Sequence, residues 1–135
     1  MSNRLIGSVA AVAGLVALAS SASAAPPDNT GNWTGKASQV GRSGTYTVTL
    51  TISKKGAESS YPDQKCSGKL TRAGGSGDYT FYTETITTGG IDPATKKGCP
   101  NGSITILRSG DTLIYGWIGA YGNKPIVVWA TLTKQ

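Results

Sequence analysis

The sequence predicts an all-β fold, a small antiparallel β-barrel of about eight strands, with a β-sandwich as the alternative. Apolar residues and threonines alternate strictly between residues 46 and 52, which is the two-residue period of a half-buried strand. Clusters of Gly, Pro, Asn and Asp interrupt the chain at the spacing typical of antiparallel barrels and sandwiches. No stretch beyond residue 24 has the 3.6-residue apolar period of an amphipathic helix.

The first 24 residues have the pattern of a secretory signal peptide. Residues 1–4 form a short basic region, residues 5–19 are apolar, and Ala22-Ser23-Ala24 is the small-residue pattern that signal peptidase accepts. An uncleaved anchor helix is the alternative, because residues 5–24 are just long enough to cross a bilayer. The segment is rich in Ala and only weakly hydrophobic, which favours cleavage after Ala24. We therefore expect a secreted protein with no membrane span after cleavage.

Cleavage would leave 111 residues, which we divide into a flexible N-terminal segment at 25–30 and one barrel domain at 31–135. Without Arg4 the chain has 12 Lys and Arg against 7 Asp and Glu, a net charge of +5. This length excludes a large catalytic α/β fold. Histidine is absent, which excludes Ser-His-Asp and Cys-His catalysis and the usual zinc sites.

The predicted strands follow one another through short turns. They cover residues 33–37, 46–52, 59–62, 68–72, 79–87, 103–108, 112–118 and 126–133. Glycine-containing turns are expected at 41–44, 54–56, 74–78, 109–111 and 119–125. The longest connection, 88–102, precedes the sixth strand. Thr is β-branched, so it suits the solvent-facing side of these strands.

Cys66 and Cys99 are the only cysteines. In an oxidising compartment two cysteines in a small domain usually pair. The bond would close a loop of about 34 residues and stabilise the fold by roughly 3–4 kcal/mol in the chain-entropy account. A catalytic thiol would need a nearby base, and there is no histidine to supply one. We therefore predict a structural disulfide.

The two ends of the domain favour a closed barrel. Gly31-Asn32-Trp33 begins the first strand, and Lys134 follows the last. This arrangement resembles lipocalin-like and avidin-like barrels of the calycin type, in which the indole of a Gly-x-Trp motif packs across the barrel floor. The resemblance implies that Trp33 closes one end and that Lys134 covers it. Closure would also remove the exposed strand edges of a Thr-rich sheet.

A longer ordered series of motifs spans about 100 residues. It comprises Trp33-Thr-Gly35, Tyr46-x-Val48-x-Leu50-x-Ile52, Ser60-Tyr61-Pro62, Cys66-Ser-Gly68-x-Leu70, Tyr79-x-Phe81-x-x-Glu84-x-Ile86, Gly98-Cys99, Gly102-Ser-Ile104, Gly110-Asp-Thr-Leu113-x-Tyr115-x-Trp117 and Ala130-Thr-Leu132-Thr133. The series resembles a small extracytoplasmic β domain that recurs in actinobacterial exported proteins and in the outer regions of some membrane-bound Ser/Thr kinases. This chain departs from the kinases in having no kinase domain and no membrane helix after the signal. The resemblance implies the fold, export and the disulfide, and it brings no established ligand or activity.

Glu84 is the acid with the most unusual surroundings. Strand alternation places Tyr82, Glu84 and Ile86 on one face. If that face lines the barrel, Glu84 would orient a ligand, and it would need a partner such as Arg72 or Arg108. A structural ion pair or an exposed strand position is the alternative.

Aromatic residues gather in the last quarter of the chain, as Tyr115, Trp117, Tyr121 and Trp129. Tyr115 and Trp117 share a strand face, and at a barrel mouth they would stack on a sugar or a flat apolar ligand. Core packing is the alternative for this group, because the chain has one Phe and few Leu to fill a core.

These features predict a secreted, monomeric, non-enzymatic barrel that binds a small ligand or a cell-envelope component. The candidate ligand-binding residues are Glu84, Tyr82, Tyr115, Trp117 and Arg108. The positive charge is dispersed, so we expect no nucleic-acid partner, and no motif or spacing indicates a cofactor or a metal. A secreted interaction or inhibitor module acting through its loops is the alternative. An enzyme that uses Glu84 with a tyrosine is a weaker one, because the set of acid–base groups is so small.

Overall fold

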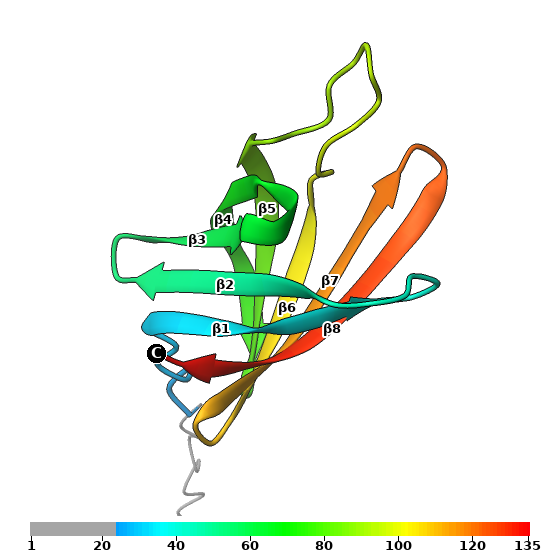
Figure 1. The fold of residues 1–135 in the computed structure, drawn as a ribbon. Coiled ribbons are helices and arrows are strands. Elements are labelled where there is room, and N and C mark those ends of the chain that lie inside the picture. The colour runs from blue at the N-terminus through cyan, green and yellow to red at the C-terminus, as the bar shows by residue number, and fades with distance from the viewer. Residues whose placement is uncertain (1–23) are drawn as a thin grey trace, which may run out of the picture.

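The computed structural model describes residues 24–135, which form a closed antiparallel barrel of eight strands (Figure 1). The strands are β1 (Gly31–Gln39), β2 (Tyr46–Ser53), β3 (Gly56–Tyr61), β4 (Cys66–Ser76), β5 (Tyr79–Thr88), β6 (Gly102–Ser109), β7 (Thr112–Tyr121) and β8 (Lys124–Lys134). Each strand pairs with the next one along the chain, and β8 pairs with β1 to close the barrel. The predicted all-β barrel is confirmed, and the sandwich alternative is wrong.

Side-chain alternation along each strand fills the barrel interior. On β2, Val48, Leu50 and Ile52 are buried while Thr49 and Thr51 face outward. The same two-residue period buries Leu113, Tyr115 and Trp117 on β7 and Val128, Ala130 and Leu132 on β8. The core is therefore made of inward-facing side chains from all eight strands.

Several strands are longer than the sequence predicts, because glycines that indicate turns lie inside them. β4 continues to Ser76, so the β4–β5 turn is confined to Gly77 and Asp78 instead of the expected 74–78. The pairing of β4 with β5 shifts register between Ser67 and Gly68 and again between Arg72 and Gly74. Such bulges bend a strand, and bending lets one long strand follow the curved barrel wall.

Trp33 closes the end of the barrel at which the chain enters. Its side chain is fully buried, and its Nε1 donates a 2.8 Å hydrogen bond to the carbonyl oxygen of Asn29. The Arg108 guanidinium lies over the indole at 4.8 Å from the ring centroid, and Lys134 Nζ lies at 5.5 Å. Arg108 also donates to the carbonyl oxygen of Asp28. The end of the segment that we expected to be flexible, residues 25–30, thus makes defined contacts with the floor.

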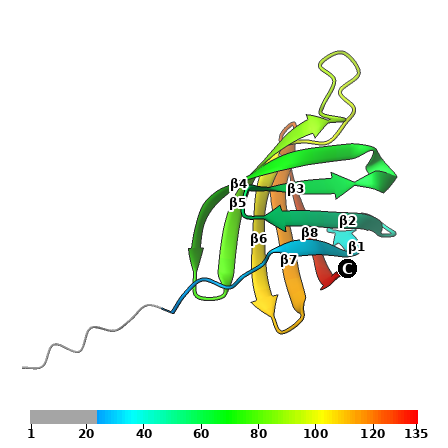
Figure 2. The same ribbon diagram turned by 90° about the vertical axis from the view of Figure 1, so that its left-hand side faces the viewer.

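The opposite end carries the long β5–β6 connection, residues 89–101. It projects beyond the barrel in two perpendicular views (Figures 1 and 2). The predicted Cys66–Cys99 disulfide is confirmed, with the two Cα atoms 6.4 Å apart, and it attaches this connection to the start of β4. Gly90 and Cys99 also form an isolated parallel bridge at the base of the loop. The base of the projecting loop is therefore fixed to the barrel.

The predicted signal segment lies outside the described residues, apart from Ala24. Within residues 24–135, no helix is long and apolar enough to cross a membrane.

Candidate functional site

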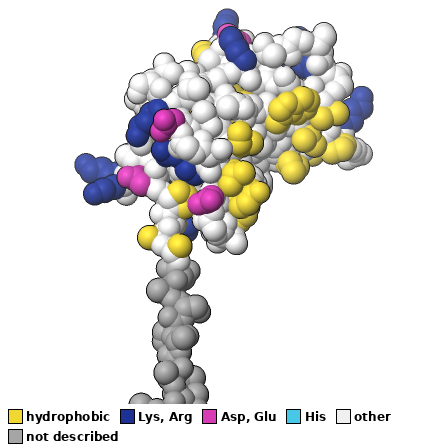
Figure 3. Space-filling model, turned by 90° about the horizontal axis from the view of Figure 1, so that it is seen from below, with side chains coloured by type: hydrophobic (Ala, Val, Ile, Leu, Met, Phe, Trp, Pro, Cys, Tyr) yellow, Lys and Arg dark blue, Asp and Glu magenta, His cyan; other side chains and the backbone are white. Residues whose placement is uncertain are grey.

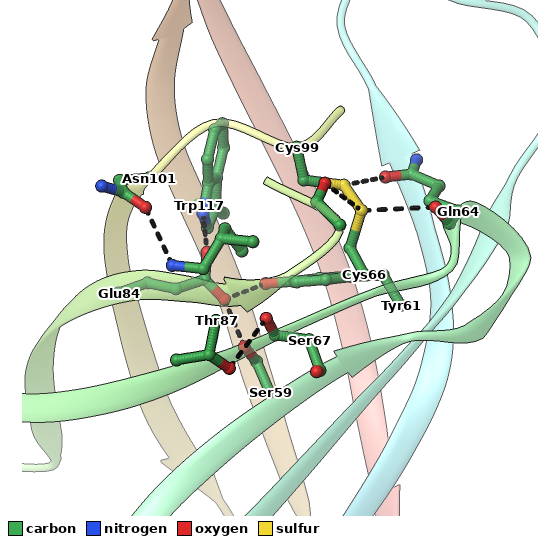
Figure 4. Close-up of a disulfide and its surroundings, with 12 residues drawn as sticks. Ser59, Tyr61, Gln64, Cys66, Ser67, Glu84, Thr87, Cys99, Asn101 and Trp117 are labelled. Carbon is green, nitrogen blue, oxygen red and sulfur yellow. Dashed lines mark hydrogen bonds between the residues drawn. A yellow bond between two sulfur atoms is a disulfide. The ribbon is translucent and has the colours of Figure 1, made fainter. Parts of the chain in front are cut away.

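Glu84 lies inside the barrel, with only 1% of its surface exposed, and its carboxylate accepts three hydrogen bonds (Figure 4). Ser59 Oγ and Tyr61 Oη, both from β3, donate to Oε1, the latter at 2.6 Å. Trp117 Nε1 from β7 donates to Oε2 at 2.6 Å. All three donors are electrically neutral. No Lys or Arg among residues 24–135 forms a salt bridge with this carboxylate.

A second tyrosine extends this network. The hydroxyl oxygens of Tyr61 and Tyr115 are 3.1 Å apart. Because the single hydrogen of Tyr61 is donated to Glu84, Tyr115 must be the donor in this pair. Burial raises the pKa of both hydroxyls well above the usual range for tyrosine, and the nearby Glu84 acts in the same direction. Both tyrosines therefore remain protonated hydrogen-bond donors around neutral pH.

Three glycines make room for this arrangement. A Cβ atom on Gly102 would lie 2.4 Å from the Trp117 ring, and one on Gly119 would lie 2.3 Å from it. On the other side, a Cβ on Gly68 would lie 3.0 Å from Ser59 Oγ and 3.1 Å from Glu84 Cγ. The lack of side chains at these strand positions lets Ser59 and the Trp117 indole reach the carboxylate.

A cavity of about 50 Å³ lies beside Glu84 and reaches the surface at the disulfide end of the barrel. It is lined by Gln39, Tyr46, Tyr61, Gln64, Glu84, Ile86, Cys99, Pro100, Tyr115, Trp117, Ile126 and Val128. Its mouth is formed by half-buried residues, among them Gln39 at the end of β1, Gln64 in the short 3-10 helix η1 (Pro62–Gln64) and Ile126 near the start of β8. A volume of this size holds only a few water molecules or a small organic group. The site is thus a small aromatic pocket with one carboxylate in its wall.

The structure brings together three of the five sequence-predicted ligand residues, Glu84, Tyr115 and Trp117. Tyr82 points inward and is buried, but it does not line the cavity. Arg108 lies at the other end of the barrel, where it contacts Trp33.

The expectation that Arg72 or Arg108 would pair with Glu84 is wrong. Arg72 is exposed, and Arg108 donates to the carbonyl oxygens of Asp28 and Gly110. A cation is not needed for local stabilisation, because three neutral donors hydrogen-bond the carboxylate directly.

Trp129 does not pack in the core with Tyr115 and Trp117. It is 51% exposed on the outer face of β8, opposite Gly116, because the alternation that buries Val128 and Ala130 turns it outward. Exposed hydrophobic side chains gather on the outside of the barrel (Figure 3). On β7 and β8 these residues are Ile114, Ile118, Val127 and Trp129.

Ser59, Tyr61 and Tyr46 belong to the site but are not predicted from the sequence. Ser59 and Tyr61 alternate inward on β3, but that strand is short and polar and has no strong hydrophobic pattern. Tyr46 packs edge-on against Tyr61, with the ring centroids 6.4 Å apart. A strand glycine often marks a close approach by another group, but the sequence predicts a loop at Gly102 and a turn at Gly119, so this signal is hidden in the sequence.

Comparison with protein families, with curated protein sequences and with solved structures finds no match to this chain. The geometry of the site is therefore the basis for proposing a function.

Proposed function

We propose that the chain is an exported, non-enzymatic barrel that binds a small ligand in the cavity beside Glu84. Export is supported by the signal-peptide pattern of the sequence and by the Cys66–Cys99 disulfide, since such bonds persist in oxidising compartments. Ligand binding is supported by an aromatic cavity that opens at one end of the barrel while Trp33 closes the other.

One observation carries this proposal: a buried carboxylate sits in the wall of an open cavity. If Glu84 contributed only to stability, an apolar side chain in its place would stabilise the fold more, because burying an ion has a large desolvation cost. Ser59, Tyr61 and Trp117 instead hold Glu84 in a fixed position beside the cavity. A preorganised polar group in an apolar pocket is the arrangement that orients a ligand.

The three tryptophans provide the test, because their indole N–H groups give separate NMR signals. Trp117 lines the cavity, Trp33 lies at the floor, and Trp129 is exposed on the outside. We expect a screen of small fragments to find compounds that shift the Trp117 indole signal saturably without moving the other two. A broad screen that leaves the Trp117 signal unmoved would overturn the proposal.

A blocked cavity is the matched control. Ile126→Trp places a large ring at the mouth, and Ile118→Trp makes the same change on the outer face of β7. Binding should be lost in I126W and kept in I118W. Equal binding by both variants would place the ligand somewhere other than this cavity.

An interaction module acting through residues 89–101 is a second candidate, favoured by the order within this loop. Asp92 Oδ1 accepts hydrogen bonds from the backbone N–H groups of Ala94 and Thr95, and Asp92 N–H donates to the carbonyl oxygen of Lys97. A loop held in one conformation loses less entropy when a partner binds. Replacing residues 91–97 with a Gly-Ser linker should abolish binding to an envelope partner, whereas I126W should retain it.

A further inference from the structure

The chemistry of the cavity wall defines the kind of ligand that fits it. We propose that the ligand is a small protonated monoamine whose ammonium group donates a hydrogen bond to the Glu84 carboxylate. This inference rests on the proposed ligand-binding function.

The hydrogen bonding of Glu84 leaves room for one more donor. A carboxylate has about four acceptor positions, two on each oxygen. Ser59 and Tyr61 occupy two positions on Oε1, and Trp117 occupies one on Oε2. The remaining position on Oε2 suits an N–H donor from a ligand.

The charge of the cavity favours a cation. Glu84 is the only acid among the twelve lining residues, and none of them is Lys or Arg. Tyr61 and Tyr115 are neutral donors, so they do not offset the negative charge. A protonated amine would do so, because close opposite charges attract strongly where water is largely excluded.

The walls suit the rest of such a molecule. Tyr46, Tyr61 and Trp117 present aromatic rings, which attract cations through their negatively polarised faces. Ile86, Ile126 and Val128 offer apolar surface to alkyl groups. The small volume and the open mouth suit a short alkylamine or the amino end of a longer one.

The charged residues at the cavity mouth favour a ligand with one amine group over a ligand with two. The hollow that continues outward from Gln39, Gln64 and Ile126 is also lined by Arg42 and Lys124. A ligand tail leaving the cavity passes these two positive charges. A neutral or anionic tail is compatible with them, whereas a second ammonium group would be repelled.

Three probes of equal size separate charge from shape: isopropylammonium, 2-propanol and acetate each have four non-hydrogen atoms. Titrated into the wild-type protein at neutral pH, with sodium chloride as the ionic-strength control, they are followed through the Trp117 indole signal. We expect isopropylammonium to bind with a dissociation constant of about 0.1–10 mM, because such a small molecule makes few contacts, and the other two probes to bind at least tenfold more weakly.

Equal or tighter binding of 2-propanol or acetate would overturn the amine proposal but not the proposal that the cavity binds a ligand. Binding by none of the three probes overturns the amine proposal. Failure of the broad fragment screen as well would overturn the proposed function.

Glu84→Gln tests the carboxylate directly. The amide oxygen of Gln can accept from Trp117, and the hydroxyls of Ser59 and Tyr61 can rotate to accept from its NH₂ group, so the shape is preserved. We expect isopropylammonium to bind at least tenfold more weakly to E84Q and 2-propanol to bind unchanged. Glu58→Gln, an exposed site on β3, removes the same charge away from the cavity and should change neither. Unchanged amine binding by E84Q would overturn the proposal. If E84Q does not fold, the titration of the three probes into the wild-type protein still tests the amine proposal.

Discussion

Trp117 Nε1 donates its hydrogen bond to Glu84 across an intervening strand. Trp117 is on β7 and Glu84 on β5, and Gly102 of β6, which lies between them, pairs with Glu84 on one side and with Gly119 on the other. The indole crosses over Gly102, where any side chain would occupy the same space. The contact between two residues 33 positions apart thus depends on a glycine that makes no hydrogen bond to either side chain.

Gly102→Ala should therefore damage the site. Its Cβ would lie 2.4 Å from the Trp117 ring, so the indole must move and its bond to Glu84 is lost. We expect a loss of about 3 kcal/mol in the free energy of unfolding, from overpacking and from the broken hydrogen bond to a charged group, measured by urea denaturation. Gly116→Ala is the control, because its Cβ would meet only Thr105 O at 3.9 Å. Equal stability of the two variants would contradict this account of Gly102.

Tyr61→Phe removes one donor to Glu84 and the acceptor for Tyr115 at the same time. Since a lost hydrogen bond to a buried charged group is destabilising, we expect a loss of about 2 kcal/mol in unfolding free energy. Tyr79→Phe makes the same chemical change at an exposed position on β5 and should have little effect. A Y61F variant as stable as Y79F would show that the network does not contribute to stability.

The barrel and part of the site could be predicted from the sequence, because both depend on local alternation. The two-residue period placed Tyr82 and Glu84 on one strand face and Tyr115 and Trp117 on another, and the structure shows that both faces point inward. The disulfide followed from the cysteine count and the expected compartment.

The partners of Glu84 could not be predicted in the same way. Ser59 and Tyr61 lie 25 and 23 residues away, and they reach it across β4, at the site of a bulge in the β4–β5 pairing. Barrel curvature and strand register determine that contact, and the residue pattern of a single strand gives no information about either. The expectation of an arginine partner assumed that a buried carboxylate requires a cation, whereas neutral donors stabilise this one.

High pH should destabilise the fold through Tyr61 and Tyr115. Burial raises the pKa of both hydroxyls in the folded state, while unfolded tyrosines ionise near pH 10. The stability they contribute is complete below about pH 10 and is lost as the pH rises further, because the unfolded chain then releases protons that the folded chain retains. At least two of the six tyrosines should fail to ionise, by ultraviolet absorbance, until the protein unfolds. Smooth ionisation of all six in the folded protein would contradict this expectation.

Removing the disulfide should affect both stability and the cavity. Replacing Cys66 and Cys99 together by Ser should lower the unfolding free energy by roughly 3–4 kcal/mol, because the bond closes a long loop. Cys99 and Pro100 also line the cavity, so probe affinity should fall as the β5–β6 connection loosens. Treatment of the wild type with a thiol reductant should reproduce both effects. An unchanged melting temperature after reduction would contradict the prediction.

Arg108→Met should destabilise the floor of the barrel and leave ligand binding in the cavity unchanged. The Arg108 guanidinium lies over Trp33 and donates to the carbonyl oxygens of Gly110 and Asp28, at 2.6 and 3.0 Å. Met retains much of the apolar stem but loses these contacts, so we expect a loss of about 1–2 kcal/mol in unfolding free energy.

Arg72→Met is the matched control, since Arg72 is exposed, and it should change stability by less than about 0.5 kcal/mol. Neither arginine lines the cavity beside Glu84, so both variants should bind isopropylammonium as the wild type does. Weaker amine binding by R108M in a folded protein, measured through the Trp117 indole signal, would show that the two ends of the barrel are coupled.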